Sequence, residues 1–116
     1  ACKRLAALDA RELGHDAPAP SEFNAYIGPH ICASCFETGP DVAQRFASEI
    51  GPGCVPDARH VDLEQALILD FESAGLSRER IASAHACTKC EPDRFFSYRA
   101  SGGVCGRHGA LAFRSR

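Results

Sequence analysis

The sequence predicts an α/β (α+β) fold, a layered sandwich with helices outside a mixed sheet, present here as part of a domain. Helix-like and strand-like apolar patterns alternate along 116 residues, a length that is normally one domain. Leu, Ile, Val and Phe are few and Ala is abundant, so the core is thin for a free-standing unit. The first predicted helix, over residues 2–13, also begins without a capping residue.

The predicted elements follow in the order helix, strand, strand, helix, strand, helix, strand, loop and strand. Apolar residues recur every four positions over residues 41–50, behind Pro40, which predicts the second helix. Asp62 and Gln65 form a capping pair before the third helix, and Gly75 is its predicted end. Short strands are predicted over residues 23–27, 34–37, 59–62, the end of 76–87, and 109–113.

The overall charge excludes some classes of partner. A net charge of −2 and a pI near 6.2 give no basic field for a phosphate backbone, so nucleic acid is not an expected partner. No apolar run reaches the length of about 18 residues that a transmembrane helix requires, so no membrane is expected either. Seven cysteines, an odd number, are fewer than a disulfide scaffold contains, which predicts reduced thiols and a cytoplasmic protein.

Two Cys-x-x-Cys pairs raise the possibility of a metal site. Cys32 with Cys35, and Cys87 with Cys90, could together form a tetrahedral zinc site with four thiolate ligands. However, a compact zinc ribbon separates its two pairs by roughly 15–20 residues, whereas residues 36–86 lie between these two and contain two predicted helices. This separation favours buried or incidental cysteines, and the four-cysteine zinc module is kept as an alternative.

A cysteine hydrolase is a further alternative. Cys32 or Cys35 would be its nucleophile, since both follow a Gly-Pro turn, and a neighbouring base would have to lower the thiol pKa. Histidines in or beside predicted strands are expected to be core or edge residues rather than ligands: His30, His60 and His85.

The segment FFSYR, residues 95–99, combines aromatic faces with a cation. Phe95, Phe96 and Tyr98 offer stacking surfaces, and Arg99 and Arg107 offer bidentate donors for an anion. All acidic residues precede Arg94, so the arginines after this point form a locally anion-attracting segment. The combination fits a ligand made of a nucleoside and a phosphate, although an aromatic core beside two surface arginines would give the same pattern.

Two stretches of the chain resemble the signatures of one known family. IGPHICASCFETGPDV, residues 27–42, resembles the pattern I-G-P-x-I-x-x-x-x-[YF]-E-x-G. CTKCEPDRFFSYRASGGVCGR, residues 87–107, resembles the pattern C-T…FFSYR…GR. Both patterns are typical of the YfiH-type laccase-domain proteins, also called multicopper polyphenol oxidoreductases and regarded as purine nucleoside phosphorylases.

The resemblance implies a fold, an activity and a set of site residues. The family fold is an α/β sandwich with helices outside central sheets. Its activity is phosphorolysis of purine nucleosides, alongside adenosine deamination and the older label of polyphenol oxidation, so the implied partners are a purine nucleoside and phosphate. The substrate-binding residues carried over by the match are Gly28, Pro29, Phe95, Phe96, Ser97, Tyr98, Arg99 and Arg107.

The chain also departs from the family pattern. In the family, zinc or copper is held by two histidines and a cysteine in V-H-G, A-D-C and H-A-G-W motifs, which do not occur in these 116 residues. Residues 1–116 are therefore expected to be the C-terminal portion of a single laccase-like domain, without catalytic residues or metal of their own, and inactive without the N-terminal part. Substitutions within the matched segments are Cys32-Ala33 for a second Gly-Pro, Ala100 for a second arginine, and Cys105 for a threonine.

Overall fold

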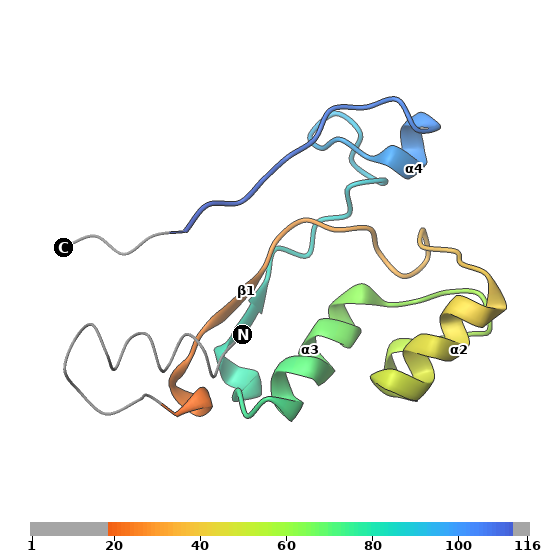
Figure 1. The fold of residues 1–116 in the computed structure, drawn as a ribbon. Coiled ribbons are helices and arrows are strands. Elements are labelled where there is room, and N and C mark those ends of the chain that lie inside the picture. The colour runs from red at the N-terminus through yellow and green to blue at the C-terminus, as the bar shows by residue number, and fades with distance from the viewer. Residues whose placement is uncertain (1–18, 113–116) are drawn as a thin grey trace.

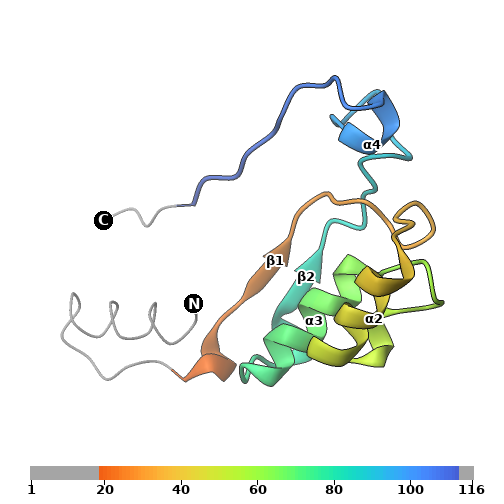
Figure 2. The ribbon, with the colours of Figure 1, turned by 45° about the vertical axis from the view of Figure 1, so that its right-hand side comes forward.

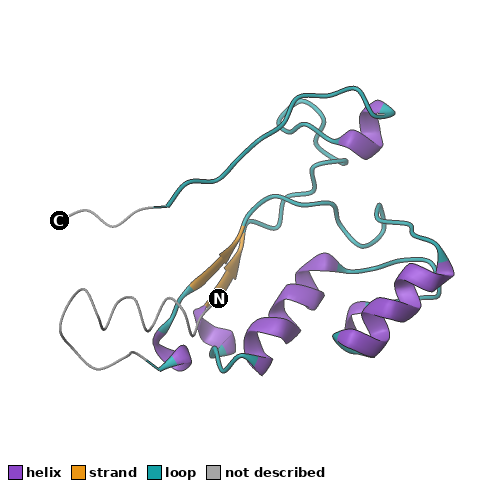
Figure 3. Ribbon diagram, in the orientation of Figure 1, coloured by secondary structure: helices purple, strands orange, loops and turns teal. Residues whose placement is uncertain are grey.

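The computed structural model describes residues 19–112, and the predicted helix over residues 2–13 lies outside this part. The chain is a small mixed α/β structure, as the sequence predicts (Figures 1 and 3). Its strands and α-helices are β1 (Ala25–Ile27), α2 (Pro40–Glu49), α3 (Leu63–Ser73), β2 (Ile81–Ser83) and α4 (Tyr98–Ser101). Short 3₁₀ helices occupy Pro20–Glu22, Pro52–Cys54 and Arg78–Arg80.

The two strands form a parallel pair. Ala25 lies opposite Ile81, and Ile27 lies opposite Ser83. Parallel strands need a long crossover connection, which here contains α2 and α3. Figures 1 and 2 show both helices on the same side of the strand pair. The pairing continues past the strands through a parallel bridge between His30 and Cys87, so the two segments that leave the sheet run side by side.

The helix boundaries follow local sequence signals. Pro40 occupies the first turn of α2, where its missing N–H costs no hydrogen bond. The side chain of Asp62 accepts a 3.1 Å hydrogen bond from the backbone N–H of Gln65 and so caps α3. After the end of α3, Gly75 has a φ of 102°, a conformation that favours glycine. The predictions of both helices are confirmed.

The core of the described part is small and built largely from small side chains. Val61 and Cys54 are its fully buried members. The other buried apolar residues are Ala25, Ile27, Ala43, Ala66, Ile68 and Leu76. Within residues 19–112, no helix has both the length and the apolar character needed to cross a membrane.

Several predicted strands are wrong. Residues 33–35 form a turn, in which the N–H of Cys35 donates to the carbonyl of Cys32 over 3.1 Å. Glu37 and His60 form an isolated antiparallel bridge in place of strands over 34–37 and 59–62. Residues 109–112 are irregular, and residue 113 lies outside the described part. A strand needs a neighbour that takes up its backbone hydrogen bonds, and alternation in the sequence does not supply one.

Candidate functional site

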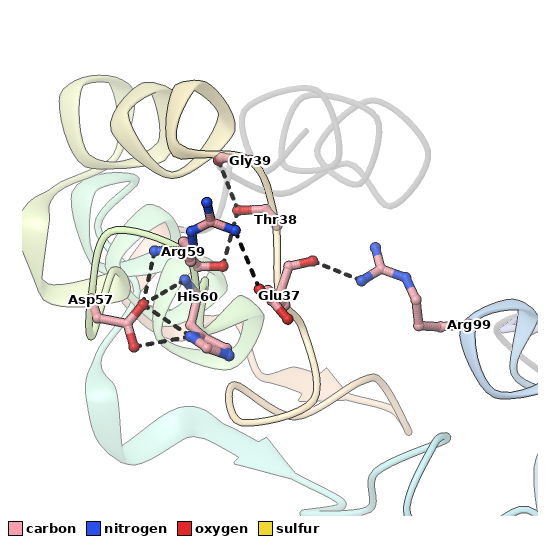
Figure 4. A network of polar contacts seen from close by, with 7 residues as sticks. All are labelled: Glu37, Thr38, Gly39, Asp57, Arg59, His60 and Arg99. Atoms are coloured by element: carbon pink, nitrogen blue, oxygen red, sulfur yellow. Dashed lines mark hydrogen bonds and ion pairs between the residues drawn. The ribbon is translucent and has the colours of Figure 1, made fainter.

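The two signature segments meet where Arg99 reaches the loop before α2. One guanidinium nitrogen of Arg99 donates a 2.7 Å hydrogen bond to the backbone carbonyl of Glu37, 62 positions earlier (Figure 4). The same guanidinium lies over the ring of Phe36, 5.3 Å from its centroid. A guanidinium held by both a hydrogen bond and an aromatic face has a defined plane. Arg99 therefore has a fixed position at this loop.

An open groove of about 560 Å³ lies beside this contact. It is lined by Phe36, Glu37, Thr38, Gly39, Val42, Arg59 and Arg99. Arg59 approaches the carboxylate of Glu37 to 3.6 Å, and both side chains are exposed. Two guanidinium groups against one carboxylate leave the lining net positive. Because guanidinium groups match the geometry of phosphate oxygens, the groove suits an anion of that kind.

Asp57 supports the loop that carries Arg59. One carboxylate oxygen of Asp57 accepts the backbone N–H groups of Arg59 and His60, at 2.8 and 2.9 Å. The ring of His60 also lies 2.9 Å from that carboxylate (Figure 4). The backbone donor of Arg59 and then the ring of His60 hold the pKa of Asp57 below its ordinary value. The backbone carbonyl of Arg59 in turn accepts from the N–H of Thr38 over 2.6 Å.

The other residues of FFSYR lie away from this groove. Phe95 and Phe96 line a separate cleft of about 280 Å³, which Cys105 also lines. Ser97 is the N-cap of α4, and its hydroxyl accepts a 3.2 Å hydrogen bond from the N–H of Ala100. Tyr98 is 68% exposed. In this structure, the predicted stacking residues Phe95 and Phe96 therefore line a different hollow from the Arg99 guanidinium.

The remaining predicted substrate-binding residues are also dispersed. The carbonyl of Gly28 faces Nδ1 of His30 at 2.9 Å. Pro29 is half-buried, and Arg107 is exposed. Glu37 and Arg59, which line the groove, were not among the predicted site residues. Glu37 could have been selected as a site residue because it is the glutamate of the I-G-P signature. Arg59 lies outside both signatures, and only the tertiary structure brings it to the groove.

The four cysteines of the two Cys-x-x-Cys pairs lie together. The sulfur atoms of Cys32, Cys35, Cys87 and Cys90 are all within 4.8 Å of one another. Cys90 is 3.5 Å from Cys35 and 4.0 Å from Cys32, measured between sulfur atoms. The long sequence separation of the two pairs argues against a shared site. That interpretation is wrong, because the pairs lie together in space. The parallel pairing of β1 with β2 delivers both pairs to the same edge.

The thiols in this cluster influence one another. Burial raises the pKa of Cys87, but backbone N–H groups of Cys32 and Cys90 donate to its sulfur and lower the pKa to about 6. A hydrogen bond with Cys35, followed by those with Cys87 and Cys32, raises the pKa of Cys90 to about 12. The pKa of Cys87 is therefore lowered and that of Cys90 raised within one cluster, as expected for thiols held close together.

Three histidines lie beside carboxylates. Glu64 lies between Nε2 of His30, at 3.6 Å, and Nδ1 of His85, at 3.4 Å, beside a cavity of about 200 Å³. His60 contacts Asp57, as described above. Among residues 19–112, the cysteine sulfurs bond to other sulfurs, a hydroxyl, carbonyls or backbone N–H groups, and none bonds to a histidine ring. His30 and His85 line the same cavity as Cys32 and Cys87, but within the described residues no Cys–His hydrogen bond of the kind that activates a cysteine hydrolase is formed.

Known proteins resemble this chain over most of its length. The family model described as multi-copper polyphenol oxidoreductase laccase matches residues 5–115. Adenosine deaminase RL5, from an unknown prokaryotic organism, is 28% identical over 111 residues, which cover 90% of this chain and 42% of RL5. Purine nucleoside phosphorylase YlmD from Geobacillus stearothermophilus is 31% identical over 105 residues, which cover 84% of this chain and 38% of YlmD.

Two solved structures share the fold. The crystal structure of YlmD from Geobacillus stearothermophilus aligns with a TM-score of 0.69 at 24% identity, over 90% of this chain and 40% of that one. The Bacillus licheniformis hypothetical protein YfiH aligns with a TM-score of 0.68 at 21% identity, over 88% of this chain and 40% of that one. This chain spans about 40% of the length of these relatives. Because the family model matches residues 5–115, the chain belongs to the multi-copper polyphenol oxidoreductase laccase family.

Proposed function

We propose that this chain is the C-terminal portion of a purine nucleoside phosphorylase, and that its groove contributes to phosphate binding. The proposal rests on the hydrogen bond of Arg99 to the Glu37 carbonyl. This bond holds the guanidinium of the FFSYR segment against the segment of the I-G-P signature. An arginine has five N–H donors. The hydrogen bond to Glu37 leaves donors of Arg99 for phosphate oxygens, and Arg59 supplies a second cation on the same groove.

Phosphorolysis makes particular demands on such a site. Phosphate must be held next to the nucleoside, the purine must be stacked, and an acid near its ring nitrogen must let the base leave in neutral form. The groove meets the first demand through Arg59 and Arg99. The aromatic residues Phe95 and Phe96 are candidates for the second, in a neighbouring cleft. We assign no acid within the described residues.

The rest of the domain is the partner that this chain requires. A two-stranded sheet is marginally stable by itself, and Tyr26 of β1 is 80% exposed. Val104 and Leu111, in the C-terminal segment, are 87% and 88% exposed. We propose that an N-terminal part of the same domain covers these side chains, and that the chain is inactive without it. The location we propose is cytoplasmic, because the cysteines are expected to be reduced thiols.

The zinc or copper implied by the family would act in that complete domain. When bound, such an ion would polarise an oxygen or activate a water molecule. Among residues 19–112, the side chains with metal-ligand spacing are the four clustered cysteines. A set of four sulfurs fits a closed tetrahedral site rather than one with an open position for substrate. We therefore place the reactive metal outside the described residues of this chain.

Adenosine deamination is the second candidate activity, and the similarity to RL5, an adenosine deaminase, favours it. The two reactions differ in their need for phosphate. Phosphorolysis consumes phosphate and releases the free base with ribose 1-phosphate, whereas deamination converts adenosine and water to inosine and ammonia without phosphate. A groove that binds phosphate has a direct role in the first reaction, which is why we place phosphorolysis first.

The test is an assay of the full-length protein that contains this chain. Adenosine and inosine are supplied with and without inorganic phosphate, and the products are separated by chromatography. The proposal predicts release of free base that depends on phosphate. Conversion of adenosine to inosine alone, independent of phosphate, would establish the deaminase instead. The purified 116-residue chain is expected to be inactive, and turnover by it would contradict the need for an N-terminal part.

A further inference from the structure

The four-cysteine cluster has the dimensions of a tetrahedral metal site. A zinc ion with Zn–S distances of about 2.3 Å holds its sulfur ligands about 3.8 Å apart. The sulfur of Cys90 lies 3.5 Å from that of Cys35 and 4.0 Å from that of Cys32. All four sulfur atoms fall within 4.8 Å of one another. The two Cys90 distances therefore differ from the ideal spacing by about 0.2–0.3 Å, and no sulfur–sulfur distance exceeds that spacing by more than about 1 Å.

The backbone around the cluster directs the sulfur atoms inward. Each Cys-x-x-Cys pair forms a turn that is closed by a backbone hydrogen bond of 3.1 Å. In the first turn, the N–H of Cys35 donates to the carbonyl of Cys32. In the second, the N–H of Glu91 donates to the carbonyl of Cys87. The N–H groups of Cys32 and Cys90 also donate to the sulfur of Cys87, at 3.2 and 3.4 Å. Such donors stabilise metal-bound thiolates and orient them.

The two turns are brought together by the fold itself. The first follows β1 and the second follows β2, at the same end of a parallel strand pair. Backbone bonds continue up to the turns, because His30 N–H donates to the Ala86 carbonyl and Thr88 N–H donates to the His30 carbonyl, both at 3.0 Å. This ladder fixes the distance between the turns. The thiol cluster is therefore a consequence of strand pairing and not of one flexible loop.

We propose that Cys32, Cys35, Cys87 and Cys90 bind one zinc ion as a structural site. The ion ties the loop after β1 to the segment that carries FFSYR, and so holds Arg99 close to Glu37. The four sulfurs complete a tetrahedral coordination shell, so the ion has no position for substrate, and it is separate from the reactive metal placed elsewhere in the domain. The proposal does not depend on phosphorylase activity.

Other cysteines provide matched controls. Cys105 is exposed and lines the cleft beside Phe96, away from the cluster. Cys54 is fully buried and its thiol faces the Gly51 carbonyl at 3.1 Å. Replacement of Cys105 by serine therefore removes a thiol without touching the cluster, whereas Cys90→Ser changes one exposed member of it.

The test measures metal directly. The 116-residue chain is purified with a thiol reductant and without added metal, and its metal content is determined by mass spectrometry. We expect about one zinc ion per chain in the wild type and in Cys105→Ser, and loss of most of this zinc in Cys90→Ser. Equal zinc contents in Cys90→Ser and Cys105→Ser would overturn the proposal, as would stoichiometric iron in place of zinc.

A second measurement needs no variant, so misfolding of Cys90→Ser would leave the proposal testable. Zinc is removed from the wild type with a chelator under reducing conditions, and Co²⁺ is added. Four thiolates around Co²⁺ give intense visible absorption typical of tetrahedral coordination, which added Zn²⁺ should then abolish. Absence of this absorption from protein with free thiols, or isolation of the four cysteines as disulfides from the freshly purified chain, would overturn the proposal.

Discussion

The side chain of Arg99 is fixed on the backbone of Glu37 by a 2.7 Å hydrogen bond, and on the ring of Phe36 by a cation–π contact. Because the bond uses a backbone carbonyl, it constrains the guanidinium and does not neutralise it. The Glu37 carboxylate is directed instead toward Arg59, at 3.6 Å (Figure 4). The groove thus keeps one guanidinium with its full charge beside another that is partly compensated.

Replacement of Arg99 by alanine should impair phosphate use in the full-length protein. Loss of hydrogen bonds to a charged group costs about 1.5–3 kcal/mol, so we expect kcat/KM for phosphorolysis to fall about 10- to 100-fold, mainly through the KM for phosphate. Arg78→Ala is the matched control, since Arg78 pairs with Glu72 and lines neither the groove nor the cleft of Phe95. Equal losses in the two variants would show that Arg99 has no special role in phosphate use.

The Asp57 carboxylate should contribute stability that depends on pH. Its pKa is lowered in the folded chain, chiefly by the backbone N–H of Arg59 and then by His60. The contribution is therefore present above the pKa of Asp57 in the unfolded chain, about 3.9, and is lost as pH falls through the lower folded value. Asp57→Asn should be less stable than wild type at neutral pH, and this difference should shrink in acid. Denaturant titrations at several pH values measure it, and a difference that stays constant with pH would contradict the assignment.

Local signals made part of the fold predictable. The cap at Asp62, the apolar spacing that follows it and the glycine after the helix all act within a few residues, and α3 forms where they indicate. The strand predictions at residues 34–37 and 59–62 failed because alternation alone cannot specify a partner. Glu37 and His60 do pair, but only through an isolated bridge.

The candidate sites depend on contacts over long sequence separations. Arg99 could be selected from the FFSYR segment, but its neighbour Arg59 enters the groove through the bond between Thr38 and the Arg59 carbonyl. The cysteine cluster shows the limit more clearly. Spacing argued against it, whereas the register of β1 on β2 sets Cys87 beside the loop that carries Cys32. The number of residues between the two pairs does not predict that register.

Asp62→Ala should destabilise the chain by removing the cap of α3. The carboxylate accepts from the N–H of Gln65, and loss of an N-cap costs about 1 kcal/mol. Chemical denaturation of the 116-residue chain should show a lower midpoint with an unchanged slope. Asp70→Ala provides the comparison, because Asp70 is an exposed residue inside the same helix. If Asp70→Ala lowered the midpoint as much, general loss of negative charge would explain the effect better than capping.

Gly75→Ala should be more harmful than alanine at another glycine. Gly75 has a φ of 102°, and a Cβ atom there would lie 3.1 Å from Cβ of Pro20, so backbone strain and crowding act together. Strained backbone positions cost roughly 1–3 kcal/mol, and the free energy of unfolding should fall by that order. Gly28→Ala is the control, because no atom lies within 4 Å of its added Cβ and its φ is outside the left-handed region. The two variants differ in backbone conformation and crowding while making the same chemical change. A midpoint for Gly75→Ala equal to that of Gly28→Ala would mean that the chain can relax after α3, and that Pro20 does not fix its path there.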